Sequence, residues 1–235
     1  MDRINLKDFH IPKRVGITLE EQAQLDKEAA DVEREKNWIL YPETFIYHHF
    51  FEGEYKLYQD CSLVNSSYGK QIRKWLTEGK GLYLWGGVGV GKTYLALSSL
   101  KWQLDRKQIG YLLVTNEFLD NLRYLIGQKD DRSLRNLLDN YCSIPMLILD
   151  DFGVQTTTAW ADEQLYEVIH KRWLKRDSLI TIVTSNYDAD ELEMKVKDEV
   201  IGARIISRII GMCEVLHIEG KDRRLRQARG EKCSQ

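Results

Sequence analysis

The stretch LYLWGGVGVGKTYLALSSL, residues 82–100, decides how the rest of this 235-residue sequence is interpreted. It consists of an apolar run, a glycine-rich turn that ends in Lys92 and Thr93, and an apolar-periodic segment typical of a helix. Glycines let backbone N–H groups turn inward around an anion, and a helix N-terminus favours negative charge. The stretch therefore predicts a strand, a phosphate-binding loop and a helix, in that order.

The loop has the spacing G-x-x-x-x-G-K-T. In such a loop the lysine reaches the β- and γ-phosphates of a nucleotide and the hydroxyl binds Mg²⁺, so ATP and Mg²⁺ are the expected cofactors. The residues predicted to line the nucleotide are Gly86, Gly87, Val88, Gly89, Val90, Gly91, Lys92, Thr93 and Tyr94. A glycine-rich turn that merely caps a helix is the alternative, and the strand before it argues against that interpretation.

The composition of the chain restricts its possible partners more than it restricts its fold. With 43% hydrophobic residues and a formal net charge of −2, any contact with nucleic acid must come from a local basic surface. The four cysteines form no C-x-x-C pair and no secretory leader is evident, so we expect free thiols and a cytoplasmic location. No apolar run approaches the roughly 20 residues of a membrane span, so no membrane contact is expected.

Apolar strands alternate with helical segments from about residue 50 onward. Predicted strands cover residues 81–85, 110–115, 146–150, 179–186 and 213–219, and predicted helices cover 58–79, the segment after Lys92, 116–127, 131–142, 161–176 and 200–210. Strands that are apolar throughout and separated by helices predict an α/β fold with a parallel sheet and helices on both faces.

The first 45 residues differ from the rest. Residues 18–38 carry many charges and few apolar side chains, and Thr18 followed by Glu21 matches a capping box at a helix start. A solvated helix and a small helical arm that binds a partner are both compatible with this composition. The expected division is an N-terminal arm at 1–45, an ATPase domain at 46–220 and a basic tail at 221–235.

A second motif, MLILDDFG at residues 146–153, ends a predicted buried strand in two acids. Open α/β sheets bind ligands at the carboxyl ends of their strands. Asp150 is therefore predicted to hold Mg²⁺ and Asp151 to polarise the attacking water. Paired acids at a strand end can also cap a helix, but the phosphate loop elsewhere in the chain favours the metal site.

Three further polar residues lie at the end of the fourth predicted strand or after it. Asn186 ends the strand LITIVTSN, where its amide could orient the attacking water or touch the γ-phosphate, although Asn is also common in turns. Arg204 and Arg208 lie four residues apart on one face of a predicted helix, with isoleucines on the other. Such arginines often only solvate a helix, yet phosphoryl-transfer sites in oligomers use a guanidinium from a neighbour.

In order and spacing, the segments GKGLYLWGGVGVGKTYLA, LILDDFG, TIVTSN, ARIISRI and IEGKDRR resemble the AAA+ ATPases of the DnaC/DnaI helicase-loader and IstB transposition-helper group. The resemblance covers about residues 55 to 225. It implies that Lys92 and Thr93 are the phosphate-loop pair, Asp150 and Asp151 the metal and catalytic acids, Asn186 the first sensor, Arg208 a trans-acting arginine finger and Arg224 the last motif arginine, with Arg223 as an alternative to Arg224.

The chain also departs from most AAA+ proteins. Asp151 stands where most of them carry Glu, so slow hydrolysis is expected, although the resembling group often has Asp. Only fifteen residues follow Gly220, so the lid domain of ordinary AAA+ proteins is expected to be absent, as in that group.

By the resemblance, the leading functional hypothesis is a replicative helicase loader. The implied partners are a hexameric helicase held by the arm, single-stranded DNA, and further copies of the chain at the ATP site. Basic residues in the helical insert, Arg123, Lys129, Arg132 and Arg135, correspond to the DNA-touching segment, although acids nearly cancel them. The alternatives are a transposition-helper ATPase and a nucleotide-dependent scaffold with little turnover; a small-molecule kinase is disfavoured because no acceptor-binding segment is evident.

Overall fold

The computed structural model describes residues 60–129, 131–153, 159–195 and 198–223. These ranges cover most of the predicted ATPase domain at 46–220. The predicted arm at 1–45, with its capping box, lies outside the described residues, as does the tail from residue 224 onward.

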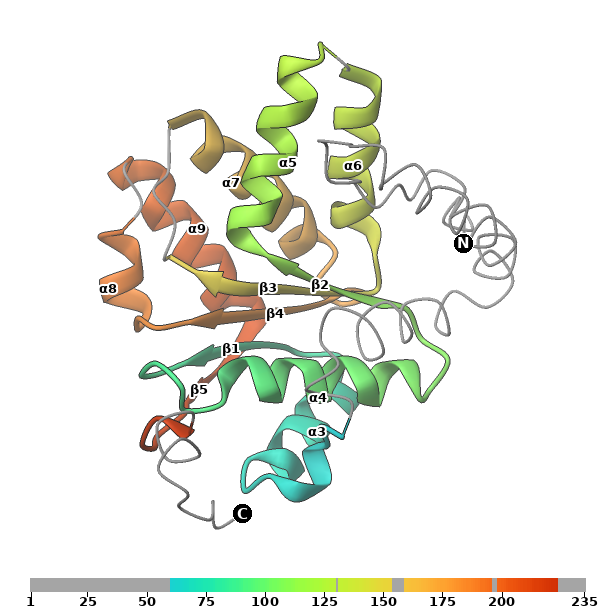
Figure 1. The fold of residues 1–235 in the computed structure, drawn as a ribbon, viewed down its shortest axis with the longest axis vertical. Helices are drawn as coiled ribbons and strands as arrows, with labels where there is room; N and C mark the ends of the chain where they lie inside the picture. The colour runs from blue at the N-terminus through green and yellow to red at the C-terminus, as the bar shows by residue number, and fades with distance from the viewer. Residues whose placement is uncertain (1–59, 130, 154–158, 196–197, 224–235) are drawn as a thin grey trace, which may run out of the picture.

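Five parallel strands form one sheet, as the sequence predicts (Figure 1). The strands are β1 (Gly81–Trp85), β2 (Gly110–Val114), β3 (Met146–Phe152), β4 (Ile180–Ser185) and β5 (Cys213–His217). Their order across the sheet is β2-β3-β4-β1-β5. Because all neighbours are parallel, the ends of β1, β3 and β4 that carry the three predicted polar motifs lie along the same edge.

Helices cover both faces of the sheet, which confirms the predicted α/β class (Figure 1). On one side lie α3 (Gly69–Thr77) and α4 (Lys92–Leu104), and on the other lie α5 (Thr115–Gly127), α6 (Asp131–Ser143), α7 (Ala159–Leu174) and α9 (Glu199–Met212). A short helix that was not predicted, α8 (Ala189–Glu193), begins at a capping box formed by Asp188 and Glu191.

The predicted helix at 58–79 is wrong over residues 60–68, and residues 58–59 lie outside the described ranges. A single 3-10 turn, η4 (Leu63–Asn65), precedes α3 instead. The Ser62 hydroxyl accepts a hydrogen bond from the Val64 N–H, and the Ser66 hydroxyl accepts one from the Tyr68 N–H. Serine side chains that bind nearby backbone donors in this way compete with helix formation.

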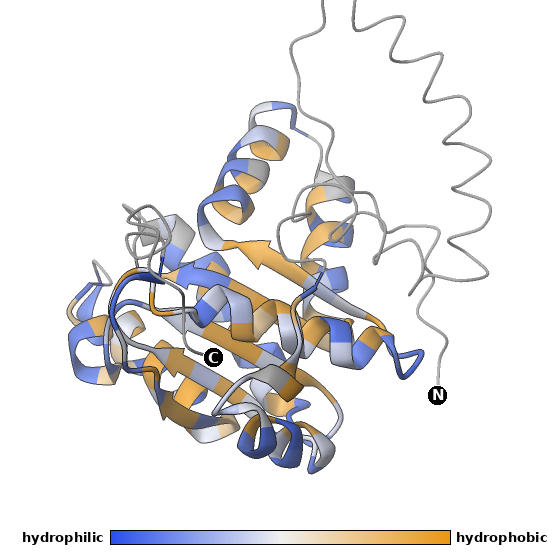
Figure 2. Cartoon of the chain, turned by 60° about the horizontal axis from the view of Figure 1, so that its bottom comes forward, coloured by the Kyte–Doolittle hydropathy of each residue, from blue (hydrophilic) through white to orange (hydrophobic). Residues whose placement is uncertain are grey.

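The inner strands are apolar along most of their length and supply the core (Figure 2). In β1 the four residues from Gly81 to Leu84 are all buried. The expectation of a strand covered on both faces is wrong for β5, where Cys213 is buried, Glu214 and Leu216 are half-buried and Val215 is 46% exposed. β5 is the last strand of the sheet and has a neighbouring strand, β1, on one side only.

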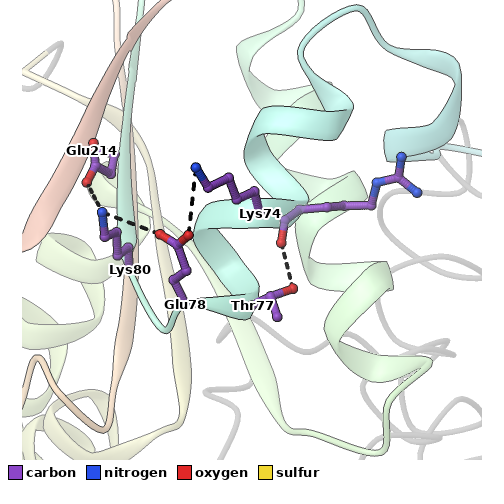
Figure 3. A network of polar contacts seen from close by, with 6 residues as sticks. Lys74, Thr77, Glu78, Lys80 and Glu214 are labelled. Atoms are coloured by element: carbon purple, nitrogen blue, oxygen red, sulfur yellow. Dashed lines mark hydrogen bonds and ion pairs between the residues drawn. The ribbon is translucent and has the colours of Figure 1, made fainter.

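A surface ion-pair network joins the end of α3 to the edge of the sheet (Figure 3). The Lys80 ammonium lies 2.6 Å from a Glu214 carboxylate oxygen on β5 and 3.4 Å from Glu78, and Lys74 reaches Glu78 at 3.9 Å. All four side chains are at least one-third exposed, so solvent screening leaves each pair with a small contribution to stability.

A buried cation, Arg172 of α7, closes the opposite end of the sheet from the predicted site. Its side chain is fully buried, and burial lowers its pKa to about 10. Because this pKa is still well above neutral pH, the guanidinium remains charged there. The guanidinium donates to the carbonyls of Tyr141, Ile144 and Ile180 and to the Thr181 hydroxyl, at 2.7–2.9 Å. It therefore ties the end of α6 to the start of β4.

We predict that Arg172→Met lowers the free energy of unfolding by about 3 kcal/mol, because three buried carbonyls lose their donors while the apolar stem is kept. Urea denaturation measures the difference. Arg176→Met, four residues further on and exposed, is the matched control and should change stability by less than about 0.5 kcal/mol. Equal effects of the two substitutions would contradict a special role for the buried guanidinium.

Candidate nucleotide site

The phosphate loop follows β1 and leads directly into α4, as the sequence predicts. Gly86 and Gly89 have φ values of 147° and 73°, a region that favours glycine. A Cβ atom on Gly86 would lie 2.3 Å from the Ile218 carbonyl oxygen, and one on Gly89 would lie 2.0 Å from the Asp222 carboxylate. The loop therefore needs glycine both for its conformation and for its close approach to the chain after β5.

The Lys92 side chain lies inside this loop and is 6% exposed. Its ammonium donates to the carbonyls of Gly86 and Gly87, at 2.9 and 2.8 Å, and to Asn186 Oδ1 at 2.7 Å. The amide at the end of β4 therefore meets the lysine of the loop, although 94 positions separate them in the chain. These two predicted residues are brought together at one point.

The other loop residues divide into lining and supporting positions. Val90 is buried, whereas Val88 is 63% exposed at the outside of the loop. The Tyr94 hydroxyl accepts a hydrogen bond from the Ser62 N–H at 3.2 Å, so the Tyr94 side chain ties α4 to the segment before α3. A contact between Tyr94 and a nucleotide would accordingly involve its backbone N–H.

The predicted metal ligands also meet. The Thr93 hydroxyl lies 3.2 and 3.1 Å from the two carboxylate oxygens of Asp150. A hydroxyl and a carboxylate beside a phosphate loop are oxygen ligands of the kind that Mg²⁺ prefers. The pair therefore fits the expected ion.

A β-bulge places the two acids. Leu149 pairs with Val183 and Phe152 pairs with Ser185, so Asp150 and Asp151 together stand opposite the single residue Thr184. Asp151 has a φ of 54°, which is uncommon for a residue other than glycine, and its side chain is exposed. Asp150 remains buried and faces Thr93, so the two neighbouring acids have different environments.

Thr184 connects both acids and was assigned no role from sequence. Its hydroxyl donates to Asp150 Oδ1 at 2.5 Å and accepts from the Asp151 N–H at 3.0 Å. Burial raises the pKa of Asp150, and the hydrogen bonds from Thr184 and Thr93 act in the opposite direction. The sequence shows that Thr184 ends an apolar strand. The hydrogen bonds of its hydroxyl to the two acids depend on the bulge.

The chain after β5 lies over the loop. The Arg223 N–H donates to the Gly89 carbonyl at 3.0 Å, and a Cβ on Gly91 would lie 3.5 Å from the Arg223 guanidinium carbon. Of the two arginines considered for the last motif, Arg223 is therefore next to the loop. Arg224 lies outside the described residues, and its role stays a prediction.

The arginines of α9 are not among the residues that meet around the phosphate loop. Arg204 is exposed and Arg208 is half-buried, while Ile205, Ile206 and Ile209 are buried as predicted. The contacts of Arg208 within the described part of the chain are with His170 and Trp173 of α7.

The remaining expectations concern surfaces and thiols. The basic residues of the insert on α5, α6 and the turn between them, Arg123, Lys129, Arg132 and Arg135, are all exposed. Cys61, Cys142 and Cys213 are free and buried, as expected, and Cys233 lies outside the described residues. Within the described ranges, none of the helices has the length and apolar character needed to cross a bilayer.

Comparison with known proteins finds an ATP-binding family. The family model described as IstB-like ATP binding protein matches residues 61–231. The replicative helicase loader DnaI of Bacillus subtilis (strain 168) is 33% identical over 156 residues, which cover 63% of this chain and 48% of the loader. A putative ATP-binding protein in an insertion sequence of Mycobacterium tuberculosis is 29% identical over 161 residues, which cover 68% of this chain and 62% of that protein.

A solved structure is similar as well. The crystal structure of the DnaC helicase loader superposes with a TM-score of 0.59 at 27% identity, covering 70% of this chain and 99% of that one. The matched part of the chain thus spans about half of one curated relative and less than two thirds of the other.

We predict that Lys92→Ala weakens the binding of Mg-ATP about a hundredfold or more, because the loop loses the cation that would face the β- and γ-phosphates. Isothermal titration measures the dissociation constant. Lys70→Ala removes an exposed lysine of α3 and should leave the constant unchanged. Near-normal affinity in the Lys92 variant would refute the assignment of the phosphate loop.

For Thr184→Val we expect kcat for ATP hydrolysis to fall about tenfold or more, because the shape is kept but both acids lose a hydrogen-bond partner. Thr184→Ser, which retains the hydroxyl, should recover most of the rate. Thermal melting checks that both variants are folded. If the valine variant hydrolyses ATP like the unaltered protein, the bulge needs no support from this hydroxyl.

Proposed function

The chain belongs to the family of IstB-like ATP binding proteins, and on this premise we propose that it is an ATPase that loads a hexameric replicative helicase onto single-stranded DNA. Its fold is that of the P-loop AAA+ ATPases, and ATP is the nucleotide of its family. The observation that carries the proposal is the convergence of Lys92 with Asn186 and of Thr93 with Asp150 at one edge of the sheet.

The chemistry depends on what each side chain can do. Lys92 would neutralise charge on the β- and γ-phosphates, and Thr93 with Asp150 would hold Mg²⁺. Bound Mg²⁺ would neutralise the charge that develops on the phosphate oxygens. Asp151, which is exposed beside Asp150, would polarise the attacking water, and Asn186 would orient it.

The arrangement favours slow turnover that depends on a second copy of the chain. Asp151 has a shorter side chain than the Glu of most AAA+ proteins, so it would reach the water less easily. Arg208 contacts α7 rather than the loop of its own chain, which supports a role at the nucleotide of a neighbour. Self-association at the ATP site is therefore part of the proposal.

The loader role is supported by the relative that is 33% identical over 156 residues, which is named a replicative helicase loader. The transposition-helper alternative is supported by the insertion-sequence relative and by the family description. In that case the partner would be a transposase. A scaffold that binds ATP with little turnover would also fit the short acid Asp151.

The remaining parts of the chain are assigned on the same basis. We place helicase binding on the arm at 1–45 and the ATPase on residues 46–220, in a reducing, cytoplasmic compartment that suits three buried thiols. Single-stranded DNA would contact the exposed basic side chains of the insert, near Tyr124. Tyr124 is itself 45% exposed. The basic tail at 221–235, which includes Arg223 and Arg224, would contact DNA or phosphate.

The test is co-purification with the replicative hexameric helicase of the same cell, with residues 1–45 present and deleted. We predict that the full chain captures the helicase, that the truncated chain does not, and that both bind Mg-ATP with the same affinity. The last measurement serves as the folding control. Deletion should act on association alone because the described site lies wholly within residues 60–223.

Each other result points to a different conclusion. Capture of the helicase by the truncated chain would move the contact into the ATPase domain. Capture of a transposase in place of the helicase would favour the transposition helper. ATP binding without turnover, with and without single-stranded DNA, would favour the scaffold.

A further inference from the structure

The guanidinium of Arg208 is held in a defined position by α7. Its central carbon lies 4.2 Å from the centre of the Trp173 ring, a distance typical of a cation–π contact. Its Nε donates to Nδ1 of His170 across a longer distance of 3.4 Å. Both partners come from the helix that packs beside α9 (Figure 1).

These two contacts use only part of the guanidinium. The group carries five N–H donors in a planar fork, and Nε supplies one of them. In the part of the chain that the structure describes, the terminal nitrogens Nη1 and Nη2 of Arg208 have no hydrogen-bond partner. Two terminal nitrogens can bind a phosphate in the bidentate manner, so this part of Arg208 is suited to an anion.

The Trp173 ring is itself fixed in place. Gly211 of α9 allows its close approach, since a Cβ there would lie 3.1 Å from the indole nitrogen. On α7, His170 stacks between Trp173 and Tyr166, with ring centres 6.0 and 5.4 Å away. Arg176 also contacts Trp173, at 4.8 Å from its centre. A ring held from these directions can restrict a long, flexible side chain that packs on it.

We propose that Trp173 is a positioning residue for Arg208, which it orients, together with His170, toward the phosphates bound by a second copy of this chain. The inference rests on the proposed trans-acting role of Arg208. It adds that α7 of the donating subunit sets the geometry of the arginine. Loss of Trp173 should therefore impair hydrolysis in the neighbour and leave the site of its own subunit intact.

The test uses mixtures of two inactive proteins. Lys92→Ala protein still offers Arg208, and Arg208→Ala protein binds ATP but offers no arginine. The ATP concentration is chosen to saturate Arg208→Ala protein while staying well below the dissociation constant of Lys92→Ala protein. Hydrolysis by the mixture, at this ATP concentration and with oligomers demonstrated by light scattering, reports the arginine of the first protein acting on the site of the second. Trp173→Leu is then added to one protein or to the other.

We expect a loss of about tenfold in kcat of the mixture when Trp173→Leu is on the arginine-donating protein, in line with the strength of a partly desolvated cation–π contact. On the ATP-binding protein the same substitution should have no effect. Trp173→Phe, which keeps an aromatic face, should restore part of the rate on the donating protein. The affinity of the ATP-binding protein for Mg-ATP should be the same in every mixture.

The chain offers a matched control. Trp102 of α4 makes a cation–π contact with Arg106 at 3.6 Å, on the other face of the sheet. Trp102→Leu on the donating protein removes the same chemistry and should leave the rate of the mixture unchanged. An equal loss with Trp102→Leu would mean that the effect of Trp173→Leu reflects general destabilisation, and would overturn the inference.

The remaining outcomes separate the inference from the function on which it rests. If the mixture without Trp173→Leu fails to recover hydrolysis although oligomers are present, the trans-acting role of Arg208 fails and the inference falls with it. If the mixture recovers but Trp173→Leu acts equally on either protein, or raises the rate, Arg208 acts in trans without being positioned by Trp173.

Discussion

The buried carboxylate of Asp150 organises the candidate nucleotide site of this protein. It is 4% exposed and meets hydroxyls from Thr93 at the start of α4 and from Thr184 at the end of β4. A carboxylate that leaves water must find hydrogen-bond donors, so three elements are held at one point by the need to satisfy it. The phosphate loop, the bulge and the fourth strand are positioned around that group.

The two ends of β4 are organised by ions of opposite sign. At its carboxyl end Thr184 binds Asp150, and at its amino end Thr181 binds the buried guanidinium of Arg172. The N–H groups of Arg172 donate to carbonyls at the end of α6, just after it and in β4, so Arg172 stabilises the fold. Asp150 faces the predicted phosphate loop, so its role lies in the candidate nucleotide site. The parallel sheet keeps these two functions apart, at opposite ends of its strands.

Helix α7 connects chemistry within one subunit to chemistry proposed between subunits. It follows the acids Asp150 and Asp151 in the chain, and its far half carries His170 and Trp173, which hold Arg208. Through these contacts α7 would take part in the arginine role that we propose between subunits.

The sequence by itself determined the five strands, the sheet type, the phosphate loop and the acids, because these features depend on local pattern. An apolar run predicts a buried strand, and a loop of eight residues contains its own phosphate-binding backbone. Only the tertiary structure decided the rest: the bulge that opposes Thr184 to two acids, the carbonyls that satisfy Arg172, the approach of Arg223 to Gly91 and the contact of Arg208 with Trp173. Each joins side chains or backbone groups far apart in the chain, and no short-range pattern encodes such pairs because the packing of whole elements creates them.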